Sequence, residues 1–255
     1  MICSAHEIPD YPARVLSLAE NDPFICRILS LYNSYPPSLA FVDYWLTSDD
    51  SGKTNGAIAR NGSNFILFLT EESDLQEISS FLRLSGAEGV LCDGRYYLDF
   101  SEKTSEGAIL KRSEPIGAKG EEPELYNPSI KAAYELIVKC ADDNFTPPDF
   151  DDFYVDLNHK LRHGAMRLYG IEDSGRLAAV AMTVAESDDG AVLGAVACDP
   201  VFRRKGFGSK IVRGTANALI AEGKTVFLHR AKNANAAFYQ KLGFSDCGEW
   251  REYKL

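Results

Sequence analysis

A basic, glycine-rich segment in the last quarter of the chain has residue types that can bind a diphosphate group. Its residues are Arg203, Arg204, Lys205, Gly206, Phe207, Gly208 and Ser209. The two glycines can adopt positive φ angles and carry no Cβ, so successive backbone N–H groups can point toward one ligand. A helix that begins there adds unpaired N–H groups and the positive end of its dipole. A bound pyrophosphate would accept several charge-assisted hydrogen bonds, each contributing about 1.5–3 kcal/mol.

The flanking sequence predicts a strand before this loop and a helix after it. Residues 191–198 form an apolar run typical of a strand, and residues 208–222 show helical spacing. Gly223 is suited to end that helix at its C′ position. A P-loop is excluded because G-x-x-x-x-G-K-[ST] is absent, and a dinucleotide fingerprint would need glycine in place of Ile211. The alternative interpretation is that the two glycines are ordinary loop residues and that the three cations only face solvent, without binding a diphosphate.

Two motifs in this half of the chain resemble the GNAT N-acetyltransferase superfamily. The run from Val196 to Gly208, VACDPVFRRKGFG, looks like the V-x-P-x-x-[QR]-x-x-G-x-[GA] signature of that superfamily. The run from Asn235 to Phe244, NAAFYQKLGF, is similar to its C-terminal N-x-x-x-Y-x-K-x-G-F helix. The resemblance covers residues 128–255. The first half resembles, in its order of elements, the degenerate N-terminal half of glycine N-acyltransferase-like tandem proteins.

The resemblance implies a site for acetyl-CoA, used as a co-substrate without a metal. The strand end would pair with the pantetheine arm, the glycine loop would hold the pyrophosphate, and Asn235 would contact the coenzyme near the pantetheine. Tyr239 would protonate the leaving thiolate; its alternative is a core tyrosine beside Phe238. The implied coenzyme contacts are Val196, Ala197, Cys198, Arg203, Arg204, Lys205, Gly206, Phe207, Gly208, Ser209 and Asn235.

The acceptor amine needs a group that takes its proton, because an alkyl ammonium with a pKa near 10 is about one part in a thousand free base at pH 7. Some members of the superfamily use a glutamate on the strand before the loop, but residues 191–196 contain no ionisable side chain. His229 and Glu186 are the candidates. Their alternatives are a partly exposed strand-end histidine and a turn carboxylate. Cys198 is expected to pack and not to carry the acyl group.

Composition and charge exclude several classes of function. Apolar residues make up 45% of the 255 residues and charged residues 25%, which is typical of a globular protein. The net charge of −10 falls entirely on residues 1–125, which argues against nucleic acid as a partner. Neither a signal peptide nor a membrane span is apparent, and the scattered cysteines favour free thiols in the cytoplasm. His159 and His163 have helical spacing, but no third metal ligand lies near them in the sequence.

The pattern of elements predicts two domains. A polar, Pro- and Gly-containing stretch around residues 113–128 separates an N-terminal α/β domain at 1–120 from a GNAT domain at 121–255. In the first domain we expect strands at 39–46, 56–60, 65–69 and 89–92 and a helix at 74–84. In the second we expect helices from Asn127-Pro128 to about 138 and at 149–162, 208–222 and 235–242, and strands at 165–171, 176–184, 191–198, 225–229 and 250–255.

The predicted fold class is α/β, with a central twisted mixed sheet flanked by helices and a smaller GNAT-like N-terminal domain that has no cofactor site. The resemblance implies an N-acetyltransferase that moves an acetyl group from acetyl-CoA to a primary amine by direct attack in a ternary complex. The acceptor would be a small-molecule or peptide amine, and the protein a monomer or homodimer. A coenzyme-binding sensor or scaffold, and an enzyme with a longer acyl donor, are the alternatives.

Overall fold

The computed structural model describes residues 1–100, 104–117, 124–141, 146–232 and 234–255. The chain forms two compact units. The first unit comprises Met1–Ile109, His229–Ala234 and Asp246–Leu255, and the second comprises Leu110–Leu228 and Asn235–Ser245. The boundary expected at residue 120 lies outside the described residues. The units also differ from the expected domains, because two C-terminal segments belong to the first unit.

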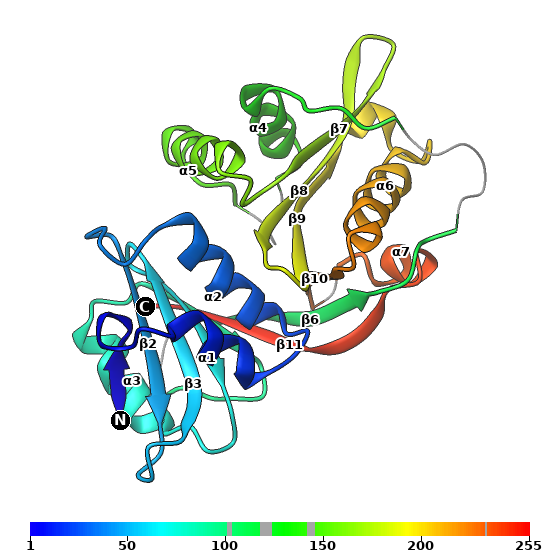
Figure 1. The fold of residues 1–255 in the computed structure, drawn as a ribbon. Coiled ribbons are helices and arrows are strands. Elements are labelled where there is room, and N and C mark those ends of the chain that lie inside the picture. Colours follow the sequence, from blue (N-terminus) through cyan, green and yellow to red (C-terminus); the bar gives the residue numbers. More distant parts are fainter. Residues whose placement is uncertain (101–103, 118–123, 142–145, 233) are drawn as a thin grey trace. The chain divides into compact units, whose positions relative to one another are not determined.

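The first unit is a mixed sheet with helices on both faces (Figure 1). Its strand order is β1-β2-β3-β4-β5-β11, and β6 lies beside β11. From β1 to β11 in this order, neighbouring strands are antiparallel except β4 and β5, which are parallel. The elements are β1 Ile2–Ser4, η1 Ala5–Glu7, α1 Tyr11–Leu18, α2 Pro23–Ser34, β2 Val42–Ser48, β3 Thr54–Asn61, β4 Asn64–Leu69, α3 Leu75–Leu84, β5 Gly89–Asp93, β6 Thr104–Arg112 and β11 Ser245–Lys254.

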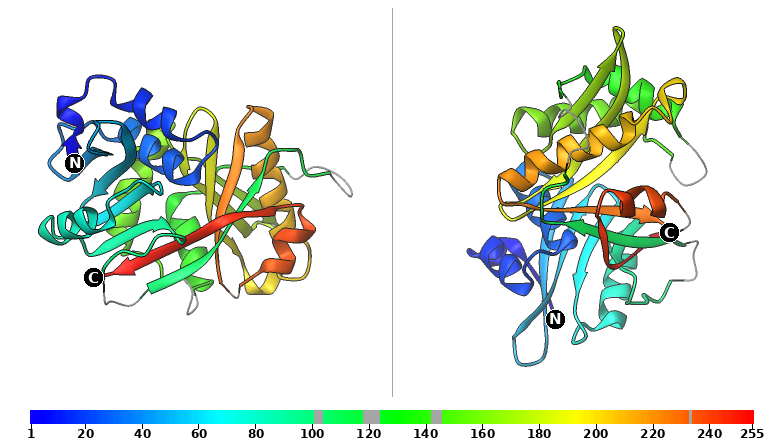
Figure 2. Two further views of the ribbon diagram at one scale, coloured as in Figure 1. Left: turned by 90° about the horizontal axis from the view of Figure 1, so that it is seen from below. Right: turned by 90° about the vertical axis from the view of Figure 1, so that its right-hand side faces the viewer.

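Helices α1 and α2 pack on β3 and β4, and α3 covers the opposite face (Figures 1 and 2). On the α3 face, Ile78 and Leu82 join a buried cluster with Phe65 and Tyr253. Helix α2 begins because the Asp22 carboxylate accepts hydrogen bonds from the N–H groups of Phe24 and Ile25, with proline at the first position. The sequence analysis identified neither α1 nor α2.

The second unit has the strand order β10-β9-β8-β7, in which β9 and β10 are parallel and the other pairs antiparallel. Helices α4 and α5 pack on one face of this sheet through Leu136, Leu157 and Val180, and α6 packs on the other (Figure 1). The elements are α4 Ile130–Lys139, α5 Phe150–Arg162, β7 Leu168–Asp173, β8 Arg176–Glu186, β9 Gly190–Cys198, η2 Pro200–Phe202, α6 Phe207–Ala221, β10 Thr225–Ala231 and α7 Ala236–Lys241.

The predicted mixed α/β fold is confirmed, and most predicted elements lie within a few residues of their expected places. Gly223 follows α6 with φ +84° and donates to the carbonyl of Ile220, as a C′ glycine does. Helix α4 starts later than expected: Ser129, not Asn127, caps it by accepting the N–H of Ala132. Within the described residues, no helix is both long and apolar enough to cross a membrane.

Candidate coenzyme site

Strand β9 leaves its parallel neighbour before it ends. Its register with β10 runs from Gly190–Thr225 to Leu193–Leu228 and stops there. On its other side β9 continues to pair with β8 as far as Cys198. The edge from 194 to 197 therefore lies beyond the β10 ladder, and its backbone groups that do not bond to β8 can pair with an extended ligand.

A β-bulge lies in the middle of this free edge. Gly194 pairs with Met182 and Ala197 pairs with Val180, so two residues of β9 face one residue of β8. Ala195 has φ +46°, a backbone conformation that alanine rarely adopts. The bulge therefore strains the backbone at this residue. The bulge turns the backbone at 195–196 out of the regular ladder. Such strained positions cluster at ligand sites.

A buried aspartate fixes the turn between β9 and the glycine loop. Asp199 Oδ1 accepts the N–H of Val201 at 3.0 Å, and its Oδ2 accepts Lys139 Nζ at 2.8 Å. The hydrogen bond from Lys139 is the main reason that the pKa of Asp199 is lowered. The carboxylate thus stays ionised and holds the loop against α4.

The loop itself presents backbone donors without protein acceptors. Arg204 and Gly206 have φ +64° and +87°, and α6 begins at the next residue, Phe207. In the described part of the chain, no backbone carbonyl accepts the N–H groups of 204, 205, 206, 207 and 209 with standard hydrogen-bond geometry. A Cβ built on Gly206 would meet nothing within 4 Å. These donors at the start of a fifteen-residue helix, with open space before them, fit a pyrophosphate.

The side chains of the glycine loop lie around these backbone donors. Arg203 Nε donates to the carbonyl of Cys198 at 3.2 Å, which braces the end of β9. Lys205 Nζ lies 5.2 Å from the centre of the Phe202 ring. The three cations remain exposed, so they supply a positive field while the backbone supplies the directed donors.

The thiol of Cys198 lies under the start of α6, where Gly208 donates its N–H to the sulfur. Burial is the largest effect on this thiol and raises its pKa above the ordinary value, so it is protonated at neutral pH. The thiol of Cys140 donates to the Cys198 carbonyl at 3.3 Å. A protonated, half-buried thiol is a weak nucleophile, which agrees with the expectation that Cys198 packs.

Helix α7, which carries Tyr239, touches the start of α6 through Phe238. A Cβ on Gly208 would lie 3.7 Å from the Phe238 ring, so the two helices are in contact there. The ring of Tyr239 packs edge-on against Phe238 and Phe244, at centroid distances of 4.9 and 5.9 Å. Burial raises the pKa of Tyr239 to about 12. Its phenol therefore holds its proton at neutral pH and can donate it.

Asn235 precedes α7 with φ +57° and is exposed. Its carbonyl accepts the N–H groups of Phe238 and Tyr239 at 3.1 and 3.3 Å, while its side chain makes no capping hydrogen bond. The predicted contact between this side chain and the coenzyme stays a prediction.

Glu186 lies at the opposite end of the β8–β9 hairpin from Cys198. It pairs with Ala191, seven residues before Cys198, which corresponds to about 23 Å along an extended strand. Its carboxylate accepts Thr183 Oγ1 at 2.7 Å and forms ion pairs with Arg167 at 3.1 Å and Lys224 at 3.9 Å. The structure does not bring Glu186 to the glycine loop. Its partners indicate that Glu186 belongs to a structural ion-pair network.

Replacing Glu186 with glutamine should therefore lower stability and leave the pH profile of turnover unchanged. Glutamine can keep the bond to Thr183 but loses both ion pairs, so we expect the free energy of unfolding in urea to fall by about 1–3 kcal/mol. Glu222→Gln is the matched control, because Glu222 also pairs with Arg167 but is 45% exposed. A stable Glu186→Gln variant that lost the acidic limb of its pH–rate profile would restore the role of base.

His229 belongs to the first unit and lies inside β10, two residues before its end. Its ring packs between Phe24, at a centroid distance of 5.7 Å, and Trp250, at 5.9 Å with planes 10° apart. Burial, with a smaller effect of Arg27, lowers the pKa of His229 well below its usual value. Its Nε2 is enclosed and has no partner among the described residues. The imidazole is therefore neutral, and its role as base stays a prediction.

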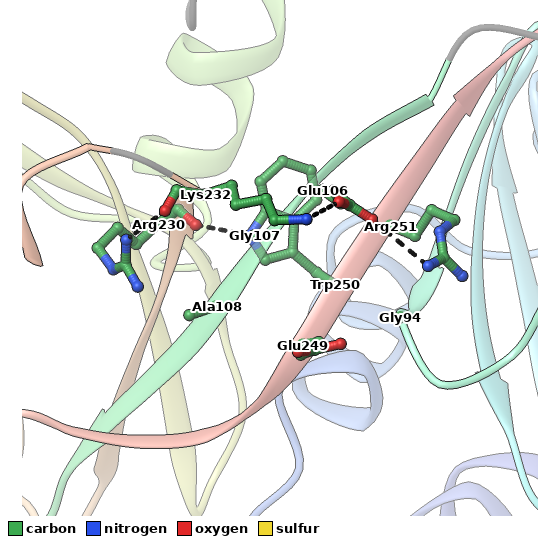
Figure 3. Close-up of a pocket in the computed structure, with 9 residues that line it drawn as sticks. All are labelled: Gly94, Glu106, Gly107, Ala108, Arg230, Lys232, Glu249, Trp250 and Arg251. Carbon is green, nitrogen blue, oxygen red and sulfur yellow. Dashed lines mark hydrogen bonds and ion pairs between the residues drawn. The ribbon is translucent and has the colours of Figure 1, made fainter.

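A polar hollow of about 160 Å³ opens on the first unit where β6, β10 and β11 meet (Figure 3). Several of its charged side chains have partners: Glu106 forms ion pairs with Lys232 and Arg251, and Arg230 Nη1 donates to the carbonyls of Ala231 and Lys232. The indole of Trp250 donates to the Arg230 carbonyl at 3.1 Å. This hydrogen bond holds the Trp250 ring, which stacks on His229, in place.

Comparison with known proteins places this geometry in a known fold. Residues 168–254 match the family model described as FR47-like protein. A tandem GNAT protein from the clavulanic acid biosynthesis pathway superposes with a TM-score of 0.60 at 12% identity, covering 99% of this chain and 97% of that one. The chain has a tandem GNAT fold. No curated protein matches the sequence.

Two further solved structures superpose over nearly the whole chain. A Drosophila melanogaster protein superposes with a TM-score of 0.63 at 12% identity, with 99% and 97% of the two chains covered. An acetyltransferase of the GNAT family from Colwellia psychrerythraea superposes with a TM-score of 0.57 at 12% identity, with 100% and 99% covered. The predictions of a GNAT fold and of a second GNAT-like half are confirmed at the level of fold.

The structure also reveals a charged residue that the sequence analysis did not consider. Arg27 lies on α2, is partly buried, and has an enclosed Nε without a hydrogen-bond partner among the described residues. The run Asn21-Asp22-Pro23 could have predicted this helix, since Asp is a good N-cap and Pro suits the first turn. Nothing local in the sequence distinguishes a buried arginine from an exposed one. Within the described residues, no three His, Cys, Asp or Glu side chains form a metal-binding group.

Proposed function

We propose that the protein transfers an acetyl group from acetyl-CoA to a primary amine by direct attack in a ternary complex. One observation carries the proposal. The free edge of β9, the unpartnered N–H groups of the glycine loop and the Tyr239 helix lie together in the second unit, joined by the contact between Gly208 and Phe238. This is the arrangement that a coenzyme with an amide-containing arm and a pyrophosphate requires.

Each part of the site has a task in this reaction. The backbone at 194–197 pairs with the amides of the pantetheine arm, and the N–H groups of 204–207 and 209 bind the pyrophosphate. The amine nitrogen attacks the thioester carbonyl carbon, so that a C–N bond forms and the C–S bond breaks. The proton of the Tyr239 phenol goes to the departing sulfur, and the amine nitrogen gives up its own proton.

The residues around the bulge supply no base for the amine proton. Residues 191–197 have no ionisable side chain, and Glu186 is held by its own ion pairs. The proton therefore leaves through water in this proposal, or to His229. Turnover should then rise with pH toward the pKa of the acceptor amine, near 10, because the free base is the reacting form.

The proposal is tested by following thiol release from acetyl-CoA. Purified protein is offered a panel of small primary amines, amino acids and peptides, and coenzyme binding is measured separately by calorimetry. We expect amine-dependent thiol release with at least one acceptor class. Normal coenzyme binding with no thiol release across the whole panel would overturn the enzymatic function.

A coenzyme-binding sensor or scaffold is the second candidate, and the absence of an ionisable side chain on residues 191–197 favours it. A longer acyl donor is a variant of the first proposal, tested by comparing acyl-CoA chain lengths in the same assay. We further propose a cytoplasmic protein, monomeric or homodimeric, with no nucleic acid or membrane partner. Its six cysteines are all free thiols.

A further inference from the structure

Strands β9 and β10 part after Leu193 and Leu228, their last paired residues, and the acyl group of the donor would lie close to that point. The glycine loop follows the carboxyl end of β9, so a coenzyme with its pyrophosphate there extends its arm from Ala197 toward Gly194. This stretch of edge is about 10 Å long, which is room for the two amides of the pantetheine arm. The thioester at the far end of the arm then reaches Gly194.

A valine side chain from the neighbouring strand β8 fills the space beside Gly194. A Cβ built on Gly194 would lie 2.5 Å from Val184 Cγ1 and 3.4 Å from its Cγ2. The shorter distance is well below the separation at which two carbon atoms pack without bonding. The methyl groups of Val184 therefore occupy the place that a side chain at position 194 would take.

A second β-bulge, on β8, brings Val184 to this place. Thr183 pairs with Leu193 and Ala185 pairs with Val192, so Val184 is the extra residue between them. Its side chain packs against the buried apolar cluster that α4 and α5 cover, and it remains half-buried. A β-branched side chain supported from behind has little rotational freedom. Val184 therefore presents a fixed apolar surface with one accessible side.

We propose that Val184 sets the chain length of the acyl donor, so that acetyl is accepted and acyl groups of four or more carbons are excluded. The proposal rests on the acyl transfer proposed above and adds the class of its donor. The pair of Leu193 and Leu228 closes the space between the strands, and Val184 covers Gly194. An acetyl methyl group ends at this point, whereas each further methylene has to displace side chains that are already packed.

Calorimetry on the full chain measures this limit without turnover. Coenzyme A, acetyl-CoA, butyryl-CoA and hexanoyl-CoA are titrated in turn into the wild-type protein. We expect butyryl-CoA and hexanoyl-CoA to bind at least about tenfold more weakly than acetyl-CoA, because their chains meet Val184. Equal affinity of the wild type for acetyl-CoA and hexanoyl-CoA would overturn the inference, and so would the absence of any coenzyme binding.

Val184→Ala should reduce the affinity gap between acetyl-CoA and hexanoyl-CoA to about threefold or less, because it removes the two methyl groups beside Gly194. Adding Gly194→Ala to this variant should restore the gap, since the new methyl group enters the vacated space. Val180→Ala is the matched control: it removes the same two methyl groups from β8, but Val180 is buried and pairs with Ala197. A gap that Val184→Ala leaves unchanged, or that Val180→Ala reduces equally, contradicts the assignment.

Thiol release separates a failure of this inference from a failure of the proposed function. One amine from the panel described above is held constant while the acyl donor is varied. Equal turnover with acetyl-CoA and hexanoyl-CoA would leave acyl transfer standing and overturn the chain-length limit. If no donor released thiol with any amine, acyl transfer would be overturned, and the calorimetric gap alone would decide whether Val184 limits the acyl chain.

Discussion

Tyr239→Phe should reduce turnover by well over about tenfold while leaving the affinity for coenzyme A within about twofold of wild type. The substitution removes only the hydroxyl, and the ring contacts with Phe238 and Phe244 remain. A thiolate that leaves without its proton donor is a poorer leaving group, so the loss should appear in kcat. Steady-state thiol release, together with calorimetry of coenzyme A, separates the two quantities.

The raised pKa of Tyr239 adds a second measurable consequence. A phenol with an ordinary pKa near 10 would begin to lose its proton as pH rises past 9, and the acid-catalysed rate would fall. Because burial raises the pKa to about 12, the protonated form persists, and the rate should not decline between pH 9 and 11. Tyr154→Phe, on an exposed tyrosine, is the control. Unchanged turnover in Tyr239→Phe would favour the sensor.

The conformation of the glycine loop could be predicted from sequence because the residues that determine it are close together in the chain. Glycines at 206 and 208, the cations before them and the apolar helix after them lie within twenty residues. Backbone conformation, helix capping and dipole all act over that range. The structure accordingly has a positive φ at Gly206 and a helix start at Phe207.

The division of the chain could not be predicted in the same way. Strand β11 pairs with β5, and the Tyr253 hydroxyl accepts the N–H of Leu98, 155 residues away in the sequence. An alternating strand carries no local mark of its partner, since any edge with a complementary face can accept it. The linear division at residue 120 therefore differs from units in which the C-terminal strand completes the first sheet.

Charged residues show the same limit most clearly. Glu186 was chosen because it ends a strand, but antiparallel pairing with β9 sets it beside Ala191, away from the loop. Arg27 was not considered, because the enclosure of its Nε without a partner among the described residues is a property of the folded chain. Local pattern thus predicted the conformation of the glycine loop, which we propose binds the acyl donor, while the partners of charged side chains required the fold.

Gly206→Ala should weaken coenzyme A binding by about tenfold or more, which is the second large effect expected. A Cβ at Gly206 would meet no protein atom within 4 Å, and in the proposed binding mode it would stand beside the N–H groups that bind the pyrophosphate. Alanine at φ +87° also costs about 1–2 kcal/mol in backbone strain. Calorimetry is done with coenzyme A and with pantetheine, which lacks the pyrophosphate. Weaker binding of coenzyme A alone would place the loss at the pyrophosphate, whereas weaker binding of both would place it along the pantetheine arm.

Gly223→Ala separates strain from ligand contact. Gly223 ends the same helix with φ +84°, and a Cβ there would also meet nothing within 4 Å. Both variants should therefore lose similar stability in urea, by about 1 kcal/mol, but only Gly206→Ala should lose coenzyme binding. If both variants bound coenzyme A equally well, the loop would not be the pyrophosphate site. If both lost binding equally, α6 would act through its stability and not through the donors at its start.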